Sequence, residues 1–220
     1  MCSSDLAMNF KEAWELIGGL SKPSKMPWWS YSIPATACKT GSVLAKTPGT
    51  VCHGCYALKG FYNMPVVRKA LDRRMKAMND PKFEEAFIVV LTDLWARSKS
   101  GENRFRWFDS GDIQSLDHLT KINNIAKATP TVRHWLPTKE AALVNEWMKK
   151  HGDFSFNLTV RQSHPLVGGK FNNKHRLPFS TVDAKGKSLK QCKAPEQGNK
   201  CIDCDQCWNN KVKGVNYHVH

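Results

Sequence analysis

The clearest chemical signal in the sequence is a group of four cysteines near its C-terminal end. Three of them are spaced Cys-x2-Cys-x2-Cys, so successive thiolates can reach different irons of one cluster, as in the first three ligands of bacterial-type ferredoxins. All-cysteine zinc sites also use Cys-x2-Cys pairs, and a structural zinc site is therefore the alternative. A triple run with one separate cysteine favours a [4Fe–4S] cluster. The four residues are Cys192, Cys201, Cys204 and Cys207.

A second group consists of Cys38, Cys52 and Cys55, in a long predicted loop. Three cysteines leave one iron of a cubane without a protein ligand, and an open metal position is what coordination of a substrate or cofactor needs. The open iron could hold the amino and carboxylate groups of S-adenosylmethionine (SAM). Alternatively, a cysteine of the tail supplies the fourth ligand, or the cysteines divide between one cluster and a zinc ion. No role is assigned to Cys2.

A polar segment, Asp109-Ser110-Gly111-Asp112, follows a predicted strand. In parallel barrels the carboxyl ends of the strands carry the active site. Gly111 permits close approach of a ligand to the backbone, and the carboxylates of Asp109 and Asp112 could hold a sugar hydroxyl or an amino group. The two aspartates are therefore candidate catalytic residues, and Ser110 and Gly111 are candidate cofactor-binding residues. A turn followed by a helix that Asp112 caps explains these residues equally well.

Further candidates lie at the ends of the following strands. Thr138 ends one predicted strand, and Asn157 and Arg161 lie on or after the next. We expect Thr138 and Asn157 to bind a cofactor and Arg161 to be a candidate catalytic residue at the same mouth, with ordinary turn and capping chemistry as the alternative. Lys59 follows the second cysteine group closely. It is a further catalytic candidate that would stabilise a negatively charged cluster or a bound anion, unless it is simply solvated.

The elements that must position these residues alternate between strands and helices. The sequence predicts strands at residues 28–33, 104–108, 132–136, 154–160 and 177–182, and helices at residues 10–20, 66–78, 81–98, 116–128 and 139–150. Such alternation indicates a parallel sheet with helices outside. Because the strands are too few for a full eight-stranded barrel, we expect an α/β fold in the form of a partial (β/α) barrel.

The composition changes towards the C-terminus. After Gly168 the chain becomes polar, and from Lys185 it is rich in cysteine with little apolar periodicity. This change predicts two parts. Residues 1–184 would form the partial α/β barrel with its cysteine loop, and residues 185–220 would form a cysteine-rich, cluster-binding tail that packs on the barrel.

Charge and hydropathy limit the class of protein. The 220 residues carry a formal net charge of +14, which favours contact with nucleic acid or nucleotide phosphates, although a basic surface can also serve solubility alone. No apolar run reaches the ~18 residues of a membrane span, and the N-terminus has no signal-peptide pattern. We therefore expect a cytoplasmic protein without membrane contact, in which cysteines are more typical of metal ligands than of disulfides.

Three segments together resemble an uncharacterised phage family named gene product eighty-eight. They are CHGCYALKGFY at residues 52–62, DSGDI at residues 109–113, and CIDCDQCW at residues 201–208 with VNYH at residues 215–218. The resemblance covers most of the chain from about residue 33 onward. It implies a phage-encoded iron–sulfur protein of unknown activity, located in the host cytoplasm.

The layout is also similar to that of radical SAM enzymes, in which a three-cysteine loop follows the first strand of a partial barrel. The sequence departs from that superfamily in two ways. The usual compact Cys-x3-Cys-x2-Cys is stretched between Cys38 and Cys52, and Tyr56 follows the last cysteine instead of preceding it. These departures affect the expectation of SAM binding more than the expectation of a cluster.

Two main hypotheses of function follow. In the first, the protein holds one or two [4Fe–4S] clusters and acts as a radical-SAM-like enzyme on a nucleotide or nucleic-acid-related substrate, with SAM as cofactor and a reductant protein as partner. In the second, an iron–sulfur cluster or zinc staples a non-enzymatic protein whose basic surface binds nucleic acid. An electron-transfer or redox-sensing module is a third reading. The sequence leaves open whether the protein is an enzyme.

Overall fold

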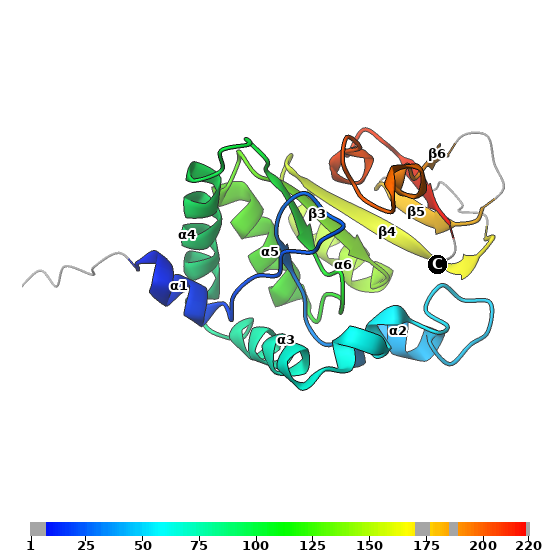
Figure 1. Ribbon diagram of the computed structural model, residues 1–220, viewed down its shortest axis with the longest axis horizontal. Coiled ribbons are helices and arrows are strands. Elements are labelled where there is room, and N and C mark those ends of the chain that lie inside the picture. The colour runs from blue at the N-terminus through cyan, green and yellow to red at the C-terminus, as the bar shows by residue number, and fades with distance from the viewer. Residues whose placement is uncertain (1–7, 170–176, 185–188, 219–220) are drawn as a thin grey trace, which may run out of the picture.

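The computed structural model describes residues 8–169, 177–184 and 189–218, which form a mixed α/β fold around one sheet (Figure 1). Cys2 lies outside these residues. The strands are β1 (Ser30–Tyr31), β2 (Arg104–Trp107), β3 (Arg133–Thr138), β4 (Leu158–Val167), β5 (Phe179–Val182), β6 (Lys190–Gln191) and β7 (Gly214–Tyr217). The α-helices are α1 (Phe10–Leu16), α2 (Lys39–Leu44), α3 (Pro65–Ala77), α4 (Phe83–Ala96), α5 (Leu116–Ala128) and α6 (Ala141–His151). Short 3-10 helices are η1 (Ala35–Ala37), η2 (Tyr56–Leu58), η3 (Gly60–Asn63), η4 (Ala194–Gln197) and η5 (Gln206–Trp208).

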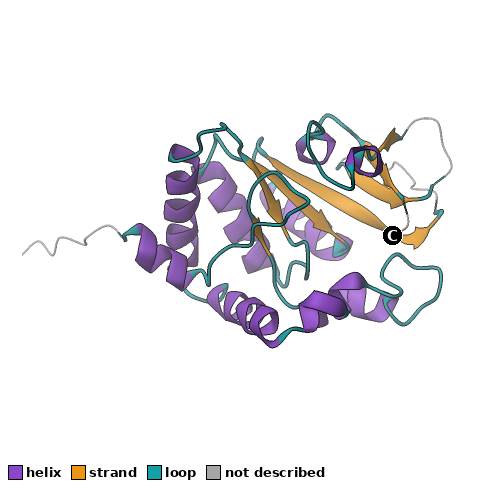
Figure 2. Cartoon of the chain, viewed as in Figure 1, coloured by secondary structure: helices purple, strands orange, loops and turns teal. Residues whose placement is uncertain are grey.

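Within the described residues the sheet has seven strands in the order β1-β2-β3-β4-β5-β7-β6, and every neighbouring pair is parallel. The first five strands are neighbours in both sequence and space. Parallel neighbours need long crossover connections, which are usually helical, and the helices of Figure 2 fill this role for β1 to β4. Because β1 and β6 lie at opposite edges, the sheet is open.

One side of the sheet, which we name the helix face, packs against α1, α4, α5 and α6. Burial alternates along β2, where Phe105 and Trp107 are fully buried in this core. Phe87 of α4 stacks on Trp107 with ring centroids 4.8 Å apart. Leu136 of β3 and Val160 of β4 belong to the same cluster. The alternation turns the intervening residues of each strand towards the other side of the sheet.

That other side, which we name the tail face, is covered in part by the C-terminal segment. Trp208 packs on Trp135 of β3 with ring centroids 5.0 Å apart, and its indole N–H donates to the Phe105 carbonyl at 2.8 Å. The Thr159 hydroxyl of β4 donates to the Trp208 carbonyl at 2.9 Å. β7 then adds to β5 in parallel. The tail therefore contributes strands to the same sheet as the N-terminal part.

Most predicted elements are present, although their bounds differ from the prediction. α5 has the predicted bounds, because the Ser115 hydroxyl caps it by accepting from the His118 N–H at 3.1 Å. The predicted strand at residues 28–33 is reduced to two residues in β1, whereas β4 begins and ends later than residues 154–160. The sequence gives no signal for β6 or β7, which are short and pair with strands distant in sequence.

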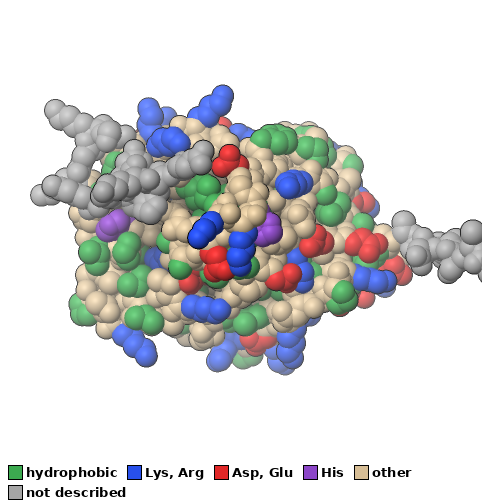
Figure 3. All heavy atoms as spheres, turned by 180° about the vertical axis from the view of Figure 1, so that it is seen from behind, with side chains coloured by type: hydrophobic (Ala, Val, Ile, Leu, Met, Phe, Trp, Pro, Cys, Tyr) green, Lys and Arg blue, Asp and Glu red, His purple; other side chains and the backbone are tan. Residues whose placement is uncertain are grey.

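None of the helices in the described ranges has the length and apolar composition needed to cross a bilayer. On the side of the molecule opposite to that of Figure 1, Lys and Arg side chains are interspersed with Asp and Glu (Figure 3). The net charge of +14 is therefore not gathered into one basic patch on this face of the described chain.

Candidate functional site

The cysteine loop, defined here as residues 38–55, lies at the carboxyl-terminal edge of the sheet. Cys38 follows β1 through η1, and α2 begins at the next residue. An isolated antiparallel bridge joins Thr50 to Leu166 near the end of β4. In Figure 1 the turn after α2 accordingly lies beside the far end of β4. The loop therefore spans from the end of the first strand to the end of the fourth.

The loop carries three free thiols, on Cys38, Cys52 and Cys55. A Cβ placed on Gly41 of α2 would lie 3.6 Å from the Cys38 Sγ and 3.7 Å from the Cys52 Sγ. The Cys55 N–H donates to the Cys52 carbonyl at 3.0 Å, which keeps these two residues in one turn. The structure thus places the three predicted ligands near one another, since Cys52 and Cys55 both affect the pKa of Cys38, and Gly41 lies beside two of the sulfurs.

Glu140 attaches the loop to the end of β3. Its Oε1 accepts from the Thr40 N–H at 2.8 Å, and its Oε2 accepts from the Thr40 hydroxyl at 2.8 Å. Cys38 occupies the N-cap position of α2 but makes no side-chain capping bond, so the buried Glu140 serves as the cap from another element. Sequence reasoning missed Glu140. No local signal pointed to it, because α2 lies in a segment predicted as a loop.

Asp112 lies next to the loop and is almost fully buried. Its Oδ1 accepts from the Thr138 hydroxyl at 2.6 Å and from the Ile113 N–H at 2.8 Å, and its Oδ2 accepts from the Lys139 N–H at 2.8 Å. Burial raises the pKa of Asp112 to about 6. Burial also raises the pKa of Cys38 to about 12, with a smaller contribution from the Asp112 carboxylate. The predicted residues Cys38, Asp112 and Thr138 are therefore neighbours.

Two tyrosines that follow the loop hold Asp109. Its Oδ2 accepts from the Tyr62 hydroxyl at 2.9 Å, and its carbonyl accepts from the Tyr56 hydroxyl at 2.5 Å. Phe108 has a φ of 55°, in the left-handed region that non-glycine residues rarely adopt, so the backbone turns sharply after β2. Burial, reinforced by the Asp109 carboxylate, raises the pKa of Tyr62. Tyr62 therefore remains a hydrogen-bond donor to Asp109.

Ser110 and Gly111 lie where the backbone after β2 meets the backbone after β1. The Ile33 N–H donates to the Ser110 carbonyl at 3.1 Å, and the buried Ser110 hydroxyl has no hydrogen-bond partner among the described residues. Gly111 has a φ of 85°, and a Cβ there would lie 2.9 Å from the Ile33 carbonyl oxygen. The close approach that Gly111 permits in this structure is thus to Ile33, which leads into the cysteine loop.

Lys59 lies over the cysteine loop. Its Nζ is 3.6 Å from the position that a Cβ on Gly54 would take, and Gly54 stands between Cys52 and Cys55. The side chain of Lys59 is exposed. The cation that opposes the burial-driven rise in the pKa of Cys38 and Cys52 is the ammonium of Lys139.

The tail cysteines are held mainly by backbone bonds. The Cys192 N–H donates to the Asn216 carbonyl of β7 at 2.9 Å, and the Cys201 N–H donates to the Lys25 carbonyl at 2.9 Å. The two thiols lie near each other, because Cys192 contributes, after burial, to the raised pKa of Cys201. The remaining partners are Arg104 Nη1, which donates to the Cys204 carbonyl at 3.1 Å, and the Tyr217 hydroxyl, 3.0 Å from the Cys207 Sγ.

Arginines surround the thiols of the tail. Burial raises the pKa of Cys207 to about 12, and the Arg161 guanidinium acts in the opposite direction. Burial also raises the pKa of Cys201, again opposed by Arg106 and Arg104. Metal ligands are thiolates, so these cations would stabilise the ligand form of otherwise buried thiols.

Arg161 and Asn157 lie away from the loop. Arg161 is fully buried on the tail face, and Asn157 precedes β4 at the amino end of that strand. The structure therefore does not bring these two predicted site residues together with Asp109 and Asp112. The Arg161 guanidinium donates to the carbonyls of Phe179, Gln206, Asn209, Val212 and Lys213 at 2.9–3.4 Å. Asn157 Nδ2 donates to the carbonyls of Ala126, Thr129 and Val132 at 2.8–3.0 Å.

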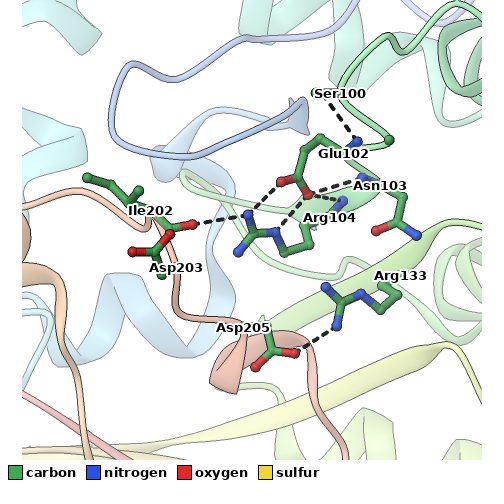
Figure 4. Close-up of a pocket in the computed structure, with 9 residues that line it drawn as sticks. Ser100, Glu102, Asn103, Arg104, Arg133, Ile202, Asp203 and Asp205 are labelled. Carbon is green, nitrogen blue, oxygen red and sulfur yellow. Dashed lines mark hydrogen bonds and ion pairs between the residues drawn. The ribbon is translucent and has the colours of Figure 1, made fainter.

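A separate polar pocket of about 390 Å³ lies at the amino-terminal edge of the sheet (Figure 4). Its charged side chains are largely paired. Arg104 contacts the Glu102 carboxylate at 2.5–2.7 Å, and Arg133 Nη1 donates to Asp205 Oδ2 at 2.8 Å. Arg104 Nη2 also donates to the Ile202 carbonyl at 3.2 Å. Arg104 of β2 and Arg133 of β3 thus bind the tail segment that carries Cys201 and Cys204 to the sheet. This pocket is remote from the cysteine loop.

The donor chemistry of both cysteine groups fits an iron–sulfur cluster. Each group offers free thiols with cations close by, namely Lys139 at the loop and Arg104 and Arg106 at the tail. Among residues 8–169, 177–184 and 189–218, no set of three or more His, Cys, Asp or Glu side chains is arranged to hold a single metal ion.

The fold and the site together define an α/β protein with a parallel sheet and two groups of free cysteines, one at the carboxyl edge and one in the tail. The chain matches the protein family described as Gene product 88 over residues 8–210. It therefore belongs to the gene product 88 family. No curated protein and no solved structure matches the chain.

Proposed function

We propose that this protein is an iron–sulfur protein in which Cys38, Cys52 and Cys55 hold a [4Fe–4S] cluster with one open iron. The observation that carries the proposal is the convergence of three free thiols beside Asp112 at the carboxyl edge of a parallel sheet. In open α/β sheets and barrels this edge is where ligands bind.

Residues around the loop would bind and orient a cofactor at this edge. When bound, a cluster with an open iron supplies one-electron reduction of coordinated SAM, and that chemistry belongs to the cofactor. The ammonium groups of Lys59 and Lys139 would offset the negative charge of the thiolates and of such a ligand, while the buried Asp112 holds the end of β3 beside Cys38. Glu140 fixes the loop through Thr40, so the thiols are positioned before any ligand arrives.

The tail would hold a second cluster, with zinc as the alternative occupant. Its four thiols would fill the ligand positions of such a site, and the arginines at positions 104, 106 and 161 would offset the charge of the thiolates. Metal bound here would contribute folding free energy to the tail strands. This role is structural, in contrast to the role proposed for the loop.

We propose that this sheet corresponds to the partial barrel of radical SAM enzymes. β1 to β5 follow one another in the sheet, their neighbours are parallel, and the helices between them cover one face. In this proposal the substrate is a nucleotide or a nucleic-acid-related molecule, and the reaction takes place in the cytoplasm of the phage host. The basic net charge of +14 is consistent with an anionic substrate.

The test begins with purification under anaerobic conditions, followed by analysis of iron, acid-labile sulfide and zinc. The proposal predicts iron and sulfide in equal amounts, and release of 5′-deoxyadenosine when the reduced protein is incubated with SAM. A Cys52→Ser/Cys55→Ser variant should lose SAM cleavage, whereas the matched Cys2→Ser variant should retain it.

The alternative function makes different predictions for the same preparations. A non-enzymatic, metal-stapled nucleic-acid-binding protein would contain zinc or an inert cluster and would release no 5′-deoxyadenosine. It would bind DNA or RNA with an affinity that falls steeply with salt concentration. These results together would contradict the enzymatic proposal and favour the nucleic-acid-binding function.

A further inference from the structure

An apolar patch is exposed beside the cysteine loop. We define the docking patch by six side chains that are 38–81% exposed, namely Val43, Tyr56, Leu58, Phe61, Met64 and Val66. All but Val43 lie in η2, in η3, at the N-cap of α3 or in its first turn, which directly follow Cys55. Exposed apolar side chains gathered in this way mark an interaction site.

The chain around the docking patch carries positive charge only. Between Glu15 and Asp72 the sequence contains no Asp or Glu. Carboxylates from other segments that come near the loop are used internally, since Asp112 and Glu140 are each only 7% exposed and Asp109 is bonded to Tyr62. The exposed basic side chains of this stretch next to the patch are Lys39, Lys46, Lys59, Arg68 and Lys69. The patch therefore presents an apolar centre with a basic rim.

We propose that the docking patch binds a small acidic electron-carrier protein, of the flavodoxin or ferredoxin kind. The inference rests on the proposed function, because a cluster in the loop must be reduced by one electron from outside. One electron would leave the partner's reduced centre, which is oxidised, and would be taken up at the centre held by Cys38, Cys52 and Cys55. The patch begins at the residues after Cys55, so a partner seated there comes close to that centre.

The chemistry of the patch favours a protein over nucleic acid. Four of its six side chains are aliphatic, and Tyr56, the aromatic member besides Phe61, is held by edge-on packing against Tyr62 and by its bond to the Asp109 carbonyl. Single-stranded nucleic acid, in contrast, is bound mainly by stacking on aromatic rings. A small apolar centre with a charged rim is typical of weak electron-transfer complexes, which bury less than ~1,200 Å² in total. The basic rim would steer an acidic partner and make its association dependent on ionic strength.

The first measurement is binding of a purified acidic flavodoxin to the full-length, anaerobically prepared protein, by titration calorimetry at low and high salt. We expect an affinity that falls about 10-fold or more between low and physiological salt. Arg68→Glu/Lys69→Glu and Phe61→Ser/Val66→Ser should each weaken binding about 10-fold. The matched controls, Lys11→Glu/Lys127→Glu and Phe156→Ser, alter equally exposed residues away from the patch and should bind like the wild type.

The second measurement is the rate of reduction of the iron–sulfur absorbance by reduced flavodoxin and by dithionite. The patch variants should be reduced about 10-fold more slowly by flavodoxin and at the wild-type rate by dithionite, which needs no docking. Binding does not require iron, so an iron-free preparation would refute the proposed function while the docking patch is still tested by calorimetry.

Two results would overturn the docking proposal. One is patch variants that bind flavodoxin as the controls do, or a wild type that binds no flavodoxin at all. The other is loss, in the patch variants alone, of binding to a single-stranded oligonucleotide or to anionic lipid vesicles with flavodoxin binding unchanged. That second result would assign the patch to nucleic acid or to a membrane surface.

Discussion

The cysteine loop and the tail group hold their thiols in different ways. In the loop, Glu140 from the segment after β3 binds Thr40, Tyr62 beyond the loop binds Asp109, and the surrounding surface is exposed. In the tail, Cys207 is buried, and Arg161 binds five carbonyls around it. The thiols of the loop therefore lie near an exposed surface, whereas those of the tail are fixed by buried hydrogen bonds.

The difference indicates that the two groups contribute differently to folding and to chemistry. Removing the contacts of the tail should destabilise the whole sheet, because β7 lies between β5 and β6. Removing the contacts of the loop should free a surface segment and leave the sheet intact. Each prediction below separates these two outcomes.

The largest effect is expected for Arg161→Met. The change leaves several buried carbonyls without a donor, and we expect a loss of about 3 kcal/mol and a fall in the melting temperature of about 10 °C. The control is Arg133→Met, which breaks the half-exposed pair with Asp205 and should cost less than about 1 kcal/mol. Equal melting temperatures of the two variants would show that the tail is not held through Arg161.

A somewhat smaller effect is expected for Gly111→Ala. The added Cβ meets the Ile33 carbonyl at a φ of 85°, so about 2–3 kcal/mol of stability should be lost, together with order in the loop that follows Ile33. Gly101→Ala is the matched control, because Gly101 also has a positive φ but no atom within 4 Å of its Cβ position. Denaturant unfolding measures both, and a cost of Gly111→Ala no greater than that of the control would argue against tight packing at Ile33.

Glu140→Ala should cost about 1–2 kcal/mol, because α2 loses its cap and Thr40 loses its partner. Hydrogen exchange should become faster in residues 38–51 and stay unchanged in β7. Glu146→Ala, which breaks an exposed pair with Lys150, should leave exchange in the loop as it is. Faster exchange in β7 as well would mean that loop and tail are not independent.

The smallest effect is expected for Tyr217→Phe, which removes a hydroxyl 3.0 Å from the Cys207 Sγ. The stability should fall by less than about 1 kcal/mol. Tyr62→Phe removes a bond to a carboxylate and should cost more, about 1–2 kcal/mol. A reversed order in thermal unfolding would contradict the assignment of the stronger side-chain contact to the loop.

Local patterns in the sequence predict most of the helices and strands and the existence of the two cysteine groups. The bounds of α5 follow from Ser115 and the apolar spacing after it, and the short gaps between cysteines predict both groups. Glu140 could not be found in this way, because its role depends on β3 ending beside the start of α2. β7 was not predicted for the same reason, since the segment GVNY forms a strand by pairing with β5, which is distant in sequence.

The position of Asn157 shows that a small error in the predicted ends of a strand can place a candidate residue at the wrong edge of the sheet. The predicted strand at residues 154–160 includes Asn157, whereas β4 begins at Leu158. Asn157 therefore lies at the amino end of the strand, where its amide binds carbonyls of α5 and of the segment after it. Periodicity gives the type of an element better than its ends, and site residues are found at the ends.

The most direct test of the central claim is the iron content of two matched variants prepared without oxygen, Cys52→Ser/Cys55→Ser and Cys204→Ser/Cys207→Ser. We predict that the loop variant loses about four irons per chain and keeps the melting temperature of the wild type within a few degrees. The tail variant should lose its own metal and much of its stability. A loop variant with the full iron content of the wild type would contradict the claim that Cys38, Cys52 and Cys55 hold a cluster.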